Sequence, residues 1–240
     1  MSEDILRGKI ALITGAGGGI GSAIAKKLAA HKMKLVLLGR SEEKLRASAD
    51  ACDTECLLLP GDLADSQYRS DVFQCVKEHF GGLDILINNA GMTLAKPFYE
   101  TTDEEFDRLM TINAKVPFQM CRDALKMLKC SNHAAIVNIT SVVAHKGYPL
   151  QSIYAASKHA LAGFSKALAA EVYKDNIRVH LISPGGVFTD MVKISRPDLT
   201  GEDMIMPEDI AQIVEFLIAN RTNAVIDEIS VHRSGKAPFA

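Results

Sequence analysis

Short apolar runs alternate with longer segments of helical periodicity along nearly the whole chain, and this alternation constrains the fold more than any other feature. The runs predict seven strands, at residues 9–14, 34–38, 55–59, 83–88, 134–139, 177–182 and 224–231. The segments between them predict six helices, at residues 20–31, 42–50, 65–80, 102–129, 152–173 and 207–220. The strands are apolar on both faces, as a parallel sheet between two helical layers requires. We therefore predict an α/β fold, one doubly wound domain over residues 1–240 with a seven-stranded parallel sheet and helices on both faces.

Composition and charge narrow the classes of function. The chain is 48% apolar and 23% charged, which excludes a disordered protein, and its net charge of −2 gives no footprint for nucleic acid or an anionic membrane. Apolar runs such as residues 35–38 are far shorter than the ~20 residues that cross a bilayer, and the N-terminus lacks the features of a secretory signal. The five cysteines are odd in number and form no Cys-x-x-Cys, which disfavours a disulfide framework or a zinc site. We expect a cytoplasmic protein with reduced thiols that acts on small molecules.

A glycine-rich turn, Thr14-Gly-Ala-Gly-Gly-Gly-Ile-Gly21, joins the first predicted strand to the first predicted helix. Glycines there let the backbone approach a diphosphate, which the helix N-terminus attracts through its free N–H groups and its dipole. A flexible turn without a ligand is the alternative interpretation. The chain contains no Gly-x-x-x-x-Gly-Lys-Ser/Thr, which argues against a phosphoryl-transfer P-loop.

The spacing of Gly15, Gly19 and Gly21 resembles that of the classical short-chain dehydrogenase/reductase family. Further family motifs follow in the family's order, namely Asp62-Leu63, Asn88-Asn-Ala-Gly91, Asn113, Ser141, Tyr154-x-x-x-Lys158 and Pro184-Gly-Gly-Val187 with Thr189. The resemblance covers residues 7 to about 231, and members similar to 3-oxoacyl-acyl-carrier-protein reductases look nearest. It implies a Rossmann fold, with nicotinamide-dependent transfer of a hydride between a carbonyl and a secondary alcohol.

Tyr154 and Lys158 lie four residues apart in a helical segment, so they share one face of the helix. A neighbouring ammonium stabilises a phenolate, so we expect Lys158 to lower the pKa of Tyr154. A surface pair covering the helix is the alternative for an isolated Tyr-x-x-x-Lys. The resemblance implies that Ser141 hydrogen-bonds the substrate carbonyl oxygen, that Tyr154 donates the proton and that Lys158 holds the nicotinamide ribose.

Asn113 is the fourth catalytic candidate. Pro117 stands four residues later in a helical pattern and has no N–H for the Asn113 carbonyl, which predicts a kink and a free carbonyl. In the family, this carbonyl holds a water that links the lysine to solvent. The alternative is a helix that ends near Ala114 and restarts at Pro117.

The end of the second strand indicates which cofactor binds. An acidic residue there would repel a 2′-phosphate, but the chain has Gly39 followed by Arg40, which can pair with that phosphate, so we expect NADP(H). Ser41 either adds a phosphate contact or caps the helix at residues 42–50. The cofactor-binding residues that we predict are Gly15, Gly17, Gly18, Gly19, Ile20, Gly21, Arg40, Ser41, Asp62, Leu63, Asn89, Ala90, Gly91, Tyr154, Lys158, Pro184, Gly185, Val187 and Thr189.

The substrate side is less constrained. Residues 188–206 form a short substrate loop, and the predicted substrate contacts are Ser141, Val143, His145, Gln151 and Tyr154, with Thr93 and Phe188 as further candidates for the pocket wall. A solvated loop histidine is the alternative for His145. The other histidines show no ligand-like spacing, so no metal site is expected. In the family, the long helices on either side of the fifth strand join subunits, so we expect a homotetramer or a homodimer.

These features predict an NADP(H)-dependent carbonyl reductase or alcohol dehydrogenase with Tyr154 as the acid/base. A 3-oxoacyl thioester reductase is the alternative enzyme, and a nucleotide-binding regulator is the alternative from another class. A methyltransferase that uses S-adenosylmethionine would need an acidic residue where Gly39 stands. The sequence does not name the substrate.

Overall fold

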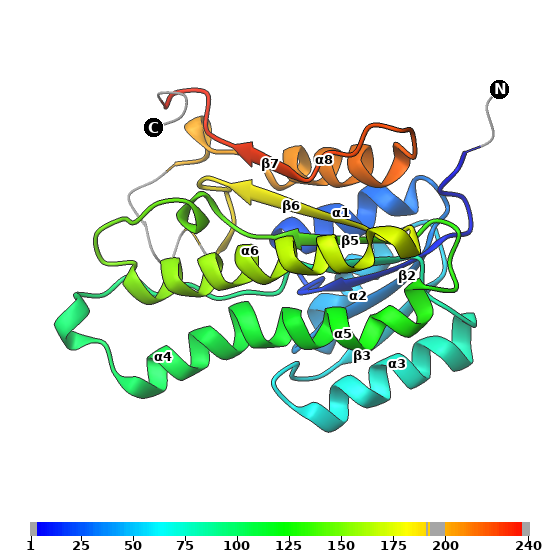
Figure 1. The fold of residues 1–240 in the computed structure, drawn as a ribbon, viewed down its shortest axis with the longest axis horizontal. Helices are drawn as coiled ribbons and strands as arrows, with labels where there is room; N and C mark the ends of the chain where they lie inside the picture. The colour runs from blue at the N-terminus through cyan, green and yellow to red at the C-terminus, as the bar shows by residue number, and fades with distance from the viewer. Residues whose placement is uncertain (1–3, 191, 193–199, 237–240) are drawn as a thin grey trace.

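A seven-stranded parallel sheet forms the centre of the computed structural model, which describes residues 4–190, 192 and 200–236. The strand order is β3-β2-β1-β4-β5-β6-β7, which confirms the doubly wound sheet (Figure 1). The strands are β1 (Ile10–Thr14), β2 (Lys34–Gly39), β3 (Cys56–Pro60), β4 (Ile85–Asn88), β5 (Ala135–Ile139), β6 (Arg178–Pro184) and β7 (Glu228–Val231).

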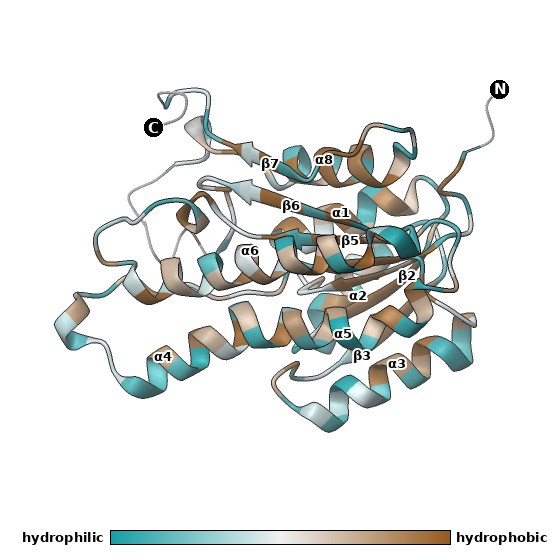
Figure 2. Ribbon diagram, viewed as in Figure 1, coloured by the Kyte–Doolittle hydropathy of each residue, from teal (hydrophilic) through white to brown (hydrophobic). Residues whose placement is uncertain are grey.

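Helices cover both faces of the sheet. Successive residues of a strand point to opposite faces, and both sets are apolar, so each face needs a helical layer to bury it. Ala11 and Ile13 of β1 pack into one core cluster, while Leu12 between them packs into the other. The first cluster lies under α1 (Gly19–Ala29), α2 (Glu42–Asp50) and α8 (Pro207–Ala219). The second lies under α3 (Ser66–Phe80), α5 (Val116–Leu128) and α6 (Ser152–Val172). Figure 2 shows the hydrophobic residues of the strands between these layers.

The helix predicted at residues 102–129 is not uniform. It consists of α4 (Asp103–Met110), a π-helical turn (Thr111–Lys115) and α5. The Val116 N–H donates to the carbonyl of Thr111, five residues earlier, and Pro117 begins the next turn without an N–H of its own. The proline therefore widens one turn, and the helix neither ends at Ala114 nor restarts at Pro117.

The last strand is shorter than predicted, beginning at Glu228, and side chains of β6 bond to backbone carbonyls in the segment before it. Arg178 donates to the carbonyls of Asn220 and Thr222, and the carbonyl of Ile226 lies 2.7 Å from Nδ1 of His180. Ladder pairing with β6 begins at Glu228, opposite Leu181.

All five cysteines are free thiols. Within the described part of the chain, none of the helices has the length and hydropathy that a bilayer crossing needs. The same part contains no group of three or more His, Cys, Asp or Glu side chains that could hold a metal ion.

Candidate active site

A cleft of about 490 Å³ lies at the carboxyl ends of the strands, where the strand order reverses between β1 and β4. Open α/β sheets bind ligands at this switch point. The cleft is lined by Gly15, Gly17, Gly18, Gly19, Ile20, Gly39, Arg40, Ser41, Lys44, Asn89, Ala90, Gly91, Met92, Ile139, Thr140, Ser141, Tyr154, Lys158, Pro184, Gly185, Val187, Thr189, Asp190 and Val192.

The glycine turn after β1 fits a diphosphate. Gly15 has φ 68°, a conformation that favours glycine, and a Cβ on Gly21 would fall inside van der Waals contact with the Gly15 carbonyl oxygen. Helix α1 begins at Gly19 without a side-chain cap and without an acidic residue in its first turn. Its free N–H groups and positive dipole end therefore remain available to an anion in the cleft.

A hydrogen-bonded lock joins the ends of β1 and β4 beneath this turn. The Thr14 hydroxyl oxygen accepts from the backbone N–H groups of Asn89 and Ala90, each at 2.9 Å. The Asn89 amide donates back to the carbonyls of Thr14 at 3.0 Å and Gly15 at 3.2 Å. Asn89 therefore lines the cleft and also fixes the glycine turn against β4.

Two cations line the cleft where β2 leads into α2. Arg40 stands there as predicted, and Lys44 from the first turn of α2 lines the same cleft. Ser41 caps the helix, because its hydroxyl accepts from the Lys44 N–H at 3.3 Å. Lys44 is not among the cofactor residues predicted from the sequence. The available signal was Ser41 as the helix cap, because that cap places Lys44 in the first turn beside Arg40.

Ser141, Tyr154 and Lys158 meet at the inner end of the cleft. Burial raises the pKa of Tyr154, while its hydrogen bond with Ser141 acts in the opposite direction. This differs from the expectation that Lys158 lowers the pKa of Tyr154. The Lys158 ammonium instead donates to the carbonyl of Ile139 at 3.0 Å and lies 6.0 Å from the Tyr154 ring centroid. Burial lowers the pKa of Lys158 to about 8, so this amine is still mostly protonated at pH 7.

Asn113 does not line the cleft but braces its wall from behind. Its fully buried amide accepts from the Met92 N–H at 2.9 Å and donates to the Met92 carbonyl at 2.8 Å. It also donates to the Ser157 hydroxyl at 3.0 Å, which in turn donates to the Tyr154 carbonyl at 2.8 Å. The side chain thus links the loop after β4 to helix α6. The main-chain carbonyl of Asn113 receives no bond from residue 117, because Pro117 has no N–H.

Three predicted cofactor residues, Gly21, Asp62 and Leu63, are not among the residues that line the cleft. Asp62 accepts from the Ala64 N–H at 2.9 Å in a local turn, and Leu63 is buried in the second core cluster. Gly21 sits beneath the glycine turn, against the Gly15 carbonyl. Of the three, only Gly21 adjoins lining residues of the cleft, namely Gly15 and Asn89.

Some of the predicted substrate contacts line the cleft and others do not. Ser141 and Tyr154 line the cleft, whereas Val143 is buried in the protein and Gln151, Thr93 and Phe188 lie off the lining. His145 is not among the lining residues either; its Nε2 lies 2.6 Å from a Glu228 oxygen. Of the predicted substrate loop, residues 191 and 193–199 lie outside the described part of the chain. Gly39, which marks the end of the second strand in the sequence, also lines the cleft. The lining residues that the motifs do not name are Lys44, Met92, Ile139, Thr140, Asp190 and Val192, most of which adjoin motif residues.

Comparison with known proteins agrees with this arrangement. The sequence profile of the short chain dehydrogenase family matches residues 9–200. Carbonyl reductase family member 4 of Xenopus laevis is 36% identical over 215 residues, covering 88% of this chain and 91% of that protein. The 3-oxoacyl-(acyl-carrier-protein) reductase FabG of Rickettsia bellii is 36% identical over 241 aligned residues, covering 96% of this chain and 97% of that protein. A crystal structure of a metagenomic short-chain oxidoreductase in complex with NADP superimposes with a TM-score of 0.83 at 30% identity, covering 96% of this chain and 99% of that one.

The fold, the cleft and these comparisons thus define an oxidoreductase of the dehydrogenase/reductase class. The chain belongs to the short-chain dehydrogenase family.

Proposed function

We propose that the protein is an NADP(H)-dependent carbonyl reductase, or alcohol dehydrogenase in reverse, with Tyr154 as its acid/base. The observation that carries this proposal is one cleft with a Ser141, Tyr154 and Lys158 cluster at its inner end and two cations at its outer end. The names of the two sequence relatives, a carbonyl reductase and a 3-oxoacyl thioester reductase, support reduction of a C=O group.

The nicotinamide supplies a hydride when it is bound. Ser141 would donate a hydrogen bond to the substrate carbonyl oxygen and hold it near the Tyr154 hydroxyl. Because the pKa of Tyr154 is raised, this hydroxyl stays protonated at neutral pH and serves as the general acid for the developing alkoxide. The Lys158 ammonium, behind Tyr154, would add positive charge to the inner end of the cleft.

The residues that would hold the cofactor follow the cleft from one end to the other. The N-terminus of α1 and the glycine turn would bind the diphosphate, as their geometry fits. The loop after β4 and the paired Tyr154 and Lys158 would contact the ribose beside the nicotinamide. The lining after β6 would contact the nicotinamide side through Pro184, Gly185, Val187 and Thr189.

We expect Arg40 and Lys44 to select NADPH over NADH. Arg40→Ala should weaken NADPH binding by ~1.5–3 kcal/mol, or about 10- to 150-fold, because a charge-assisted contact to the 2′-phosphate is lost. Lys44→Ala should cause a smaller loss, and neither variant should change NADH affinity much. Fluorescence titration with both cofactors measures this. Arg46→Ala is the matched control. Arg46 lies on α2 with Lys44, pairs with Glu42 and is absent from the cleft lining. Equal losses for NADPH and NADH in Arg40→Ala would contradict the selection.

A panel of carbonyl compounds with NADPH and NADH tests the activity itself. We expect turnover of ketones or aldehydes with NADPH. The 36% identity to the Rickettsia bellii reductase supports a second candidate, a 3-oxoacyl thioester reductase, which acetoacetyl thioesters would reveal. Tight NADPH binding without turnover of any carbonyl, thioesters included, would favour the nucleotide-binding regulator instead. We assign the substrate side to Ser141, Tyr154 and the short loop at residues 188–206, within a single catalytic domain over residues 1–240.

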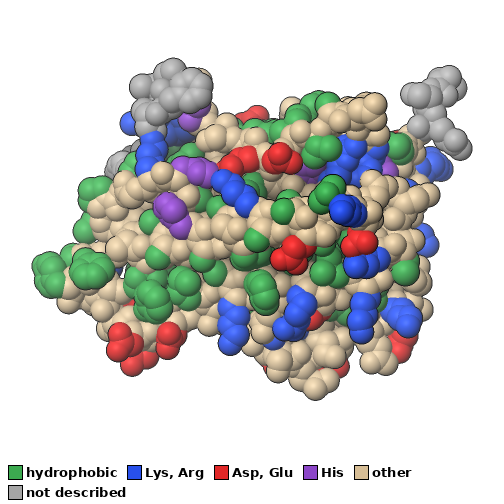
Figure 3. Space-filling model, in the orientation of Figure 1, with side chains coloured by type: hydrophobic (Ala, Val, Ile, Leu, Met, Phe, Trp, Pro, Cys, Tyr) green, Lys and Arg blue, Asp and Glu red, His purple; other side chains and the backbone are tan. Residues whose placement is uncertain are grey.

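We expect the chain to form a homotetramer or a homodimer. Large hydrophobic side chains are exposed around α4, α5 and α6, and Figure 3 shows hydrophobic side chains gathered at the left end of the view, before α4. Among them, Phe98 is 78% and Tyr99 is 84% exposed before α4, while Phe118 of α5 and Tyr173 after α6 are exposed elsewhere along these helices. Covering such surface by a second copy removes apolar area from water. Light scattering at micromolar concentration should give two or four times 26.0 kDa, and a species of 26.0 kDa would contradict the expectation.

We place the protein in the cytoplasm. Its five cysteines, of which three are half-buried, one is buried and one is exposed, are all free thiols and suit a reducing compartment. Fractionation of cells that express the chain would test the assignment, and recovery from a membrane or secreted fraction would contradict it.

A further inference from the structure

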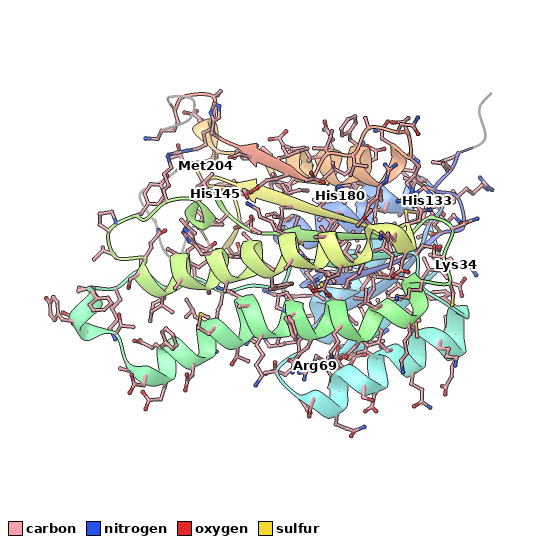
Figure 4. The ribbon with its side chains drawn as sticks, viewed as in Figure 1. Lys34, Arg69, His133, His145, His180 and Met204 are labelled. Atoms are coloured by element: carbon pink, nitrogen blue, oxygen red, sulfur yellow. The ribbon has the colours of Figure 1, made fainter. Side chains whose placement is uncertain are left out.

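The turn that carries Ser141 is fastened to the last two strands of the sheet. Ser141 precedes a short 3₁₀ helix, Val142–Ala144, and His145 follows it. Figure 4 shows His145 beside the ends of β6 and β7. Within the turn, the Ser141 hydroxyl accepts a long 3.4 Å bond from the Val143 N–H, and the Ser141 carbonyl accepts from the Ala144 N–H at 2.8 Å. Outside the turn, the Ser141 hydroxyl also bonds to Tyr154. These bonds fix the turn internally, and the anchoring of residues 140 and 145, on its two sides, fixes where the turn lies on the sheet.

The inner anchor runs through Ser183 of β6. The Thr140 hydroxyl lies 2.6 Å from the Ser183 hydroxyl, and the Thr140 N–H donates to the Ile182 carbonyl at 2.7 Å. The Ser183 hydroxyl donates in turn to Oε1 of Glu228 on β7 at 3.2 Å. Ser183 is completely buried, so no water replaces these bonds if one partner is removed.

The outer anchor ends on the same carboxylate oxygen. Nε2 of His145 lies 2.6 Å from Oε1 of Glu228 and 3.2 Å from the Ser183 hydroxyl. The other carboxylate oxygen, Oε2, pairs with Lys166 of α6 at 3.2 Å. Glu228 thus accepts bonds from the Ser141 turn, from β6 and from α6, and it is the point where both anchors meet.

We propose that Glu228, acting through Ser183 and His145, is a positioning residue for Ser141. The proposal rests on the proposed function, in which Ser141 holds the substrate oxygen for Tyr154. Glu228, Ser183 and His145 are absent from the cleft lining, so they act by fixing the turn and not by touching substrate. Reacting groups lose rate steeply when they are displaced by a fraction of an ångström, which makes such an anchor matter to turnover.

Steady-state kinetics of four variants test the proposal. Glu228→Ala should lower kcat about tenfold while the KM for NADPH stays unchanged, because the anchored turn lies away from Arg40 and the glycine turn. Glu228→Gln should recover most of the rate, since an amide oxygen still accepts from Ser183 and His145. Ser183→Ala, which removes one hydroxyl, should lower kcat in the same way if Glu228→Ala fails to fold. Glu171→Ala, the same replacement at an exposed position of α6, is the matched control and should behave as wild type.

A double-variant cycle separates this proposal from the proposed function. If Glu228 acts through Ser141, then Ser141→Ala combined with Glu228→Ala should be no slower than Ser141→Ala alone. Additive losses would overturn the positioning role. A Ser141→Ala variant with wild-type kcat would instead overturn the catalytic role of Ser141. A slow Ser141→Ala beside a fully active Glu228→Ala would overturn the positioning role only.

Hydrogen exchange of the cofactor-free protein gives a readout that does not depend on activity. Amides of residues 140–146 should exchange faster in Glu228→Ala than in wild type, whereas Glu171→Ala should leave them unchanged. Unchanged exchange at these amides in Glu228→Ala would show that the carboxylate does not hold the turn.

Discussion

Replacing Tyr154 with phenylalanine should lower kcat by ~10² or more, the scale of positioned general acid catalysis, and leave NADPH affinity nearly unchanged. The substitution removes only the hydroxyl that hydrogen-bonds Ser141 at the inner end of the cleft. The ring stays in place, so the walls that would bind the cofactor keep their shape. Turnover of a carbonyl substrate and fluorescence titration with NADPH, on the same preparation, measure the two quantities.

Tyr148→Phe is the matched control for this prediction. Tyr148 belongs to the loop before α6, is 41% exposed and does not line the cleft. Its hydroxyl can be removed without touching the Ser141, Tyr154 and Lys158 cluster, so both kcat and NADPH affinity should match wild type. A Tyr154→Phe enzyme that turns over as fast as Tyr148→Phe would rule out Tyr154 as the proton donor.

Gly21→Ala should destabilise the fold and weaken dinucleotide binding together. The new Cβ would fall against the Gly15 carbonyl oxygen and lie 2.7 Å from the Asn89 amide nitrogen, so the glycine turn or helix α1 must shift. Overpacking of this kind costs ~1–3 kcal/mol of unfolding free energy, or about 2–4 °C of Tm per kcal/mol for a chain of this size. The displaced turn should also lower NADPH and NADH affinity by about tenfold or more, since a diphosphate contact common to both cofactors is worth ~1.5–3 kcal/mol.

The comparison for Gly21→Ala is Gly82→Ala, because a Cβ on Gly82 meets nothing within 4 Å. Thermal unfolding and titration with both cofactors should leave Gly82→Ala close to wild type. If Gly21→Ala melts and binds as Gly82→Ala does, then the close approach of α1 to the glycine turn does not limit either property.

The sequence predicts the architecture well because the strands and helices bury whole faces. Strands such as β1 and β2 are apolar on both sides, so a sheet between two helical layers is the arrangement that hides them. The order of the motifs then places the glycine turn, Ser141 and Tyr154 at one edge of that sheet, because parallel strands have their carboxyl ends together. Most of the residues named from motifs line one cleft at this edge.

The sequence predicts less where distant segments decide the outcome. His145 follows Ser141 closely, which suggested a substrate contact, but Glu228 on a strand much later in the chain draws its ring away from the cleft. Lys44 reads as one more exposed helix residue until the start of α2 places it beside Arg40. The π-helical turn at Thr111–Lys115 depends on Asn113 and Pro117 together, and helical periodicity alone does not distinguish it from an uninterrupted helix.

The strand order has a consequence for how the chain emerges from the ribosome. β1 lies between β2 and β4, yet β4 is separated from β1 by two strand–helix units in sequence. A nascent chain that has completed β3 but not residues 85–88 therefore presents one full edge of β1, whose Ala11, Leu12 and Ile13 are completely buried in the finished fold. Such an open apolar edge is a template for wrong pairing with other chains. The arrival of Ile85, Leu86 and Ile87 opposite these three residues closes that edge of β1. The open edge then passes to β4, which stays uncovered until residues 135–138 of β5 pair with it.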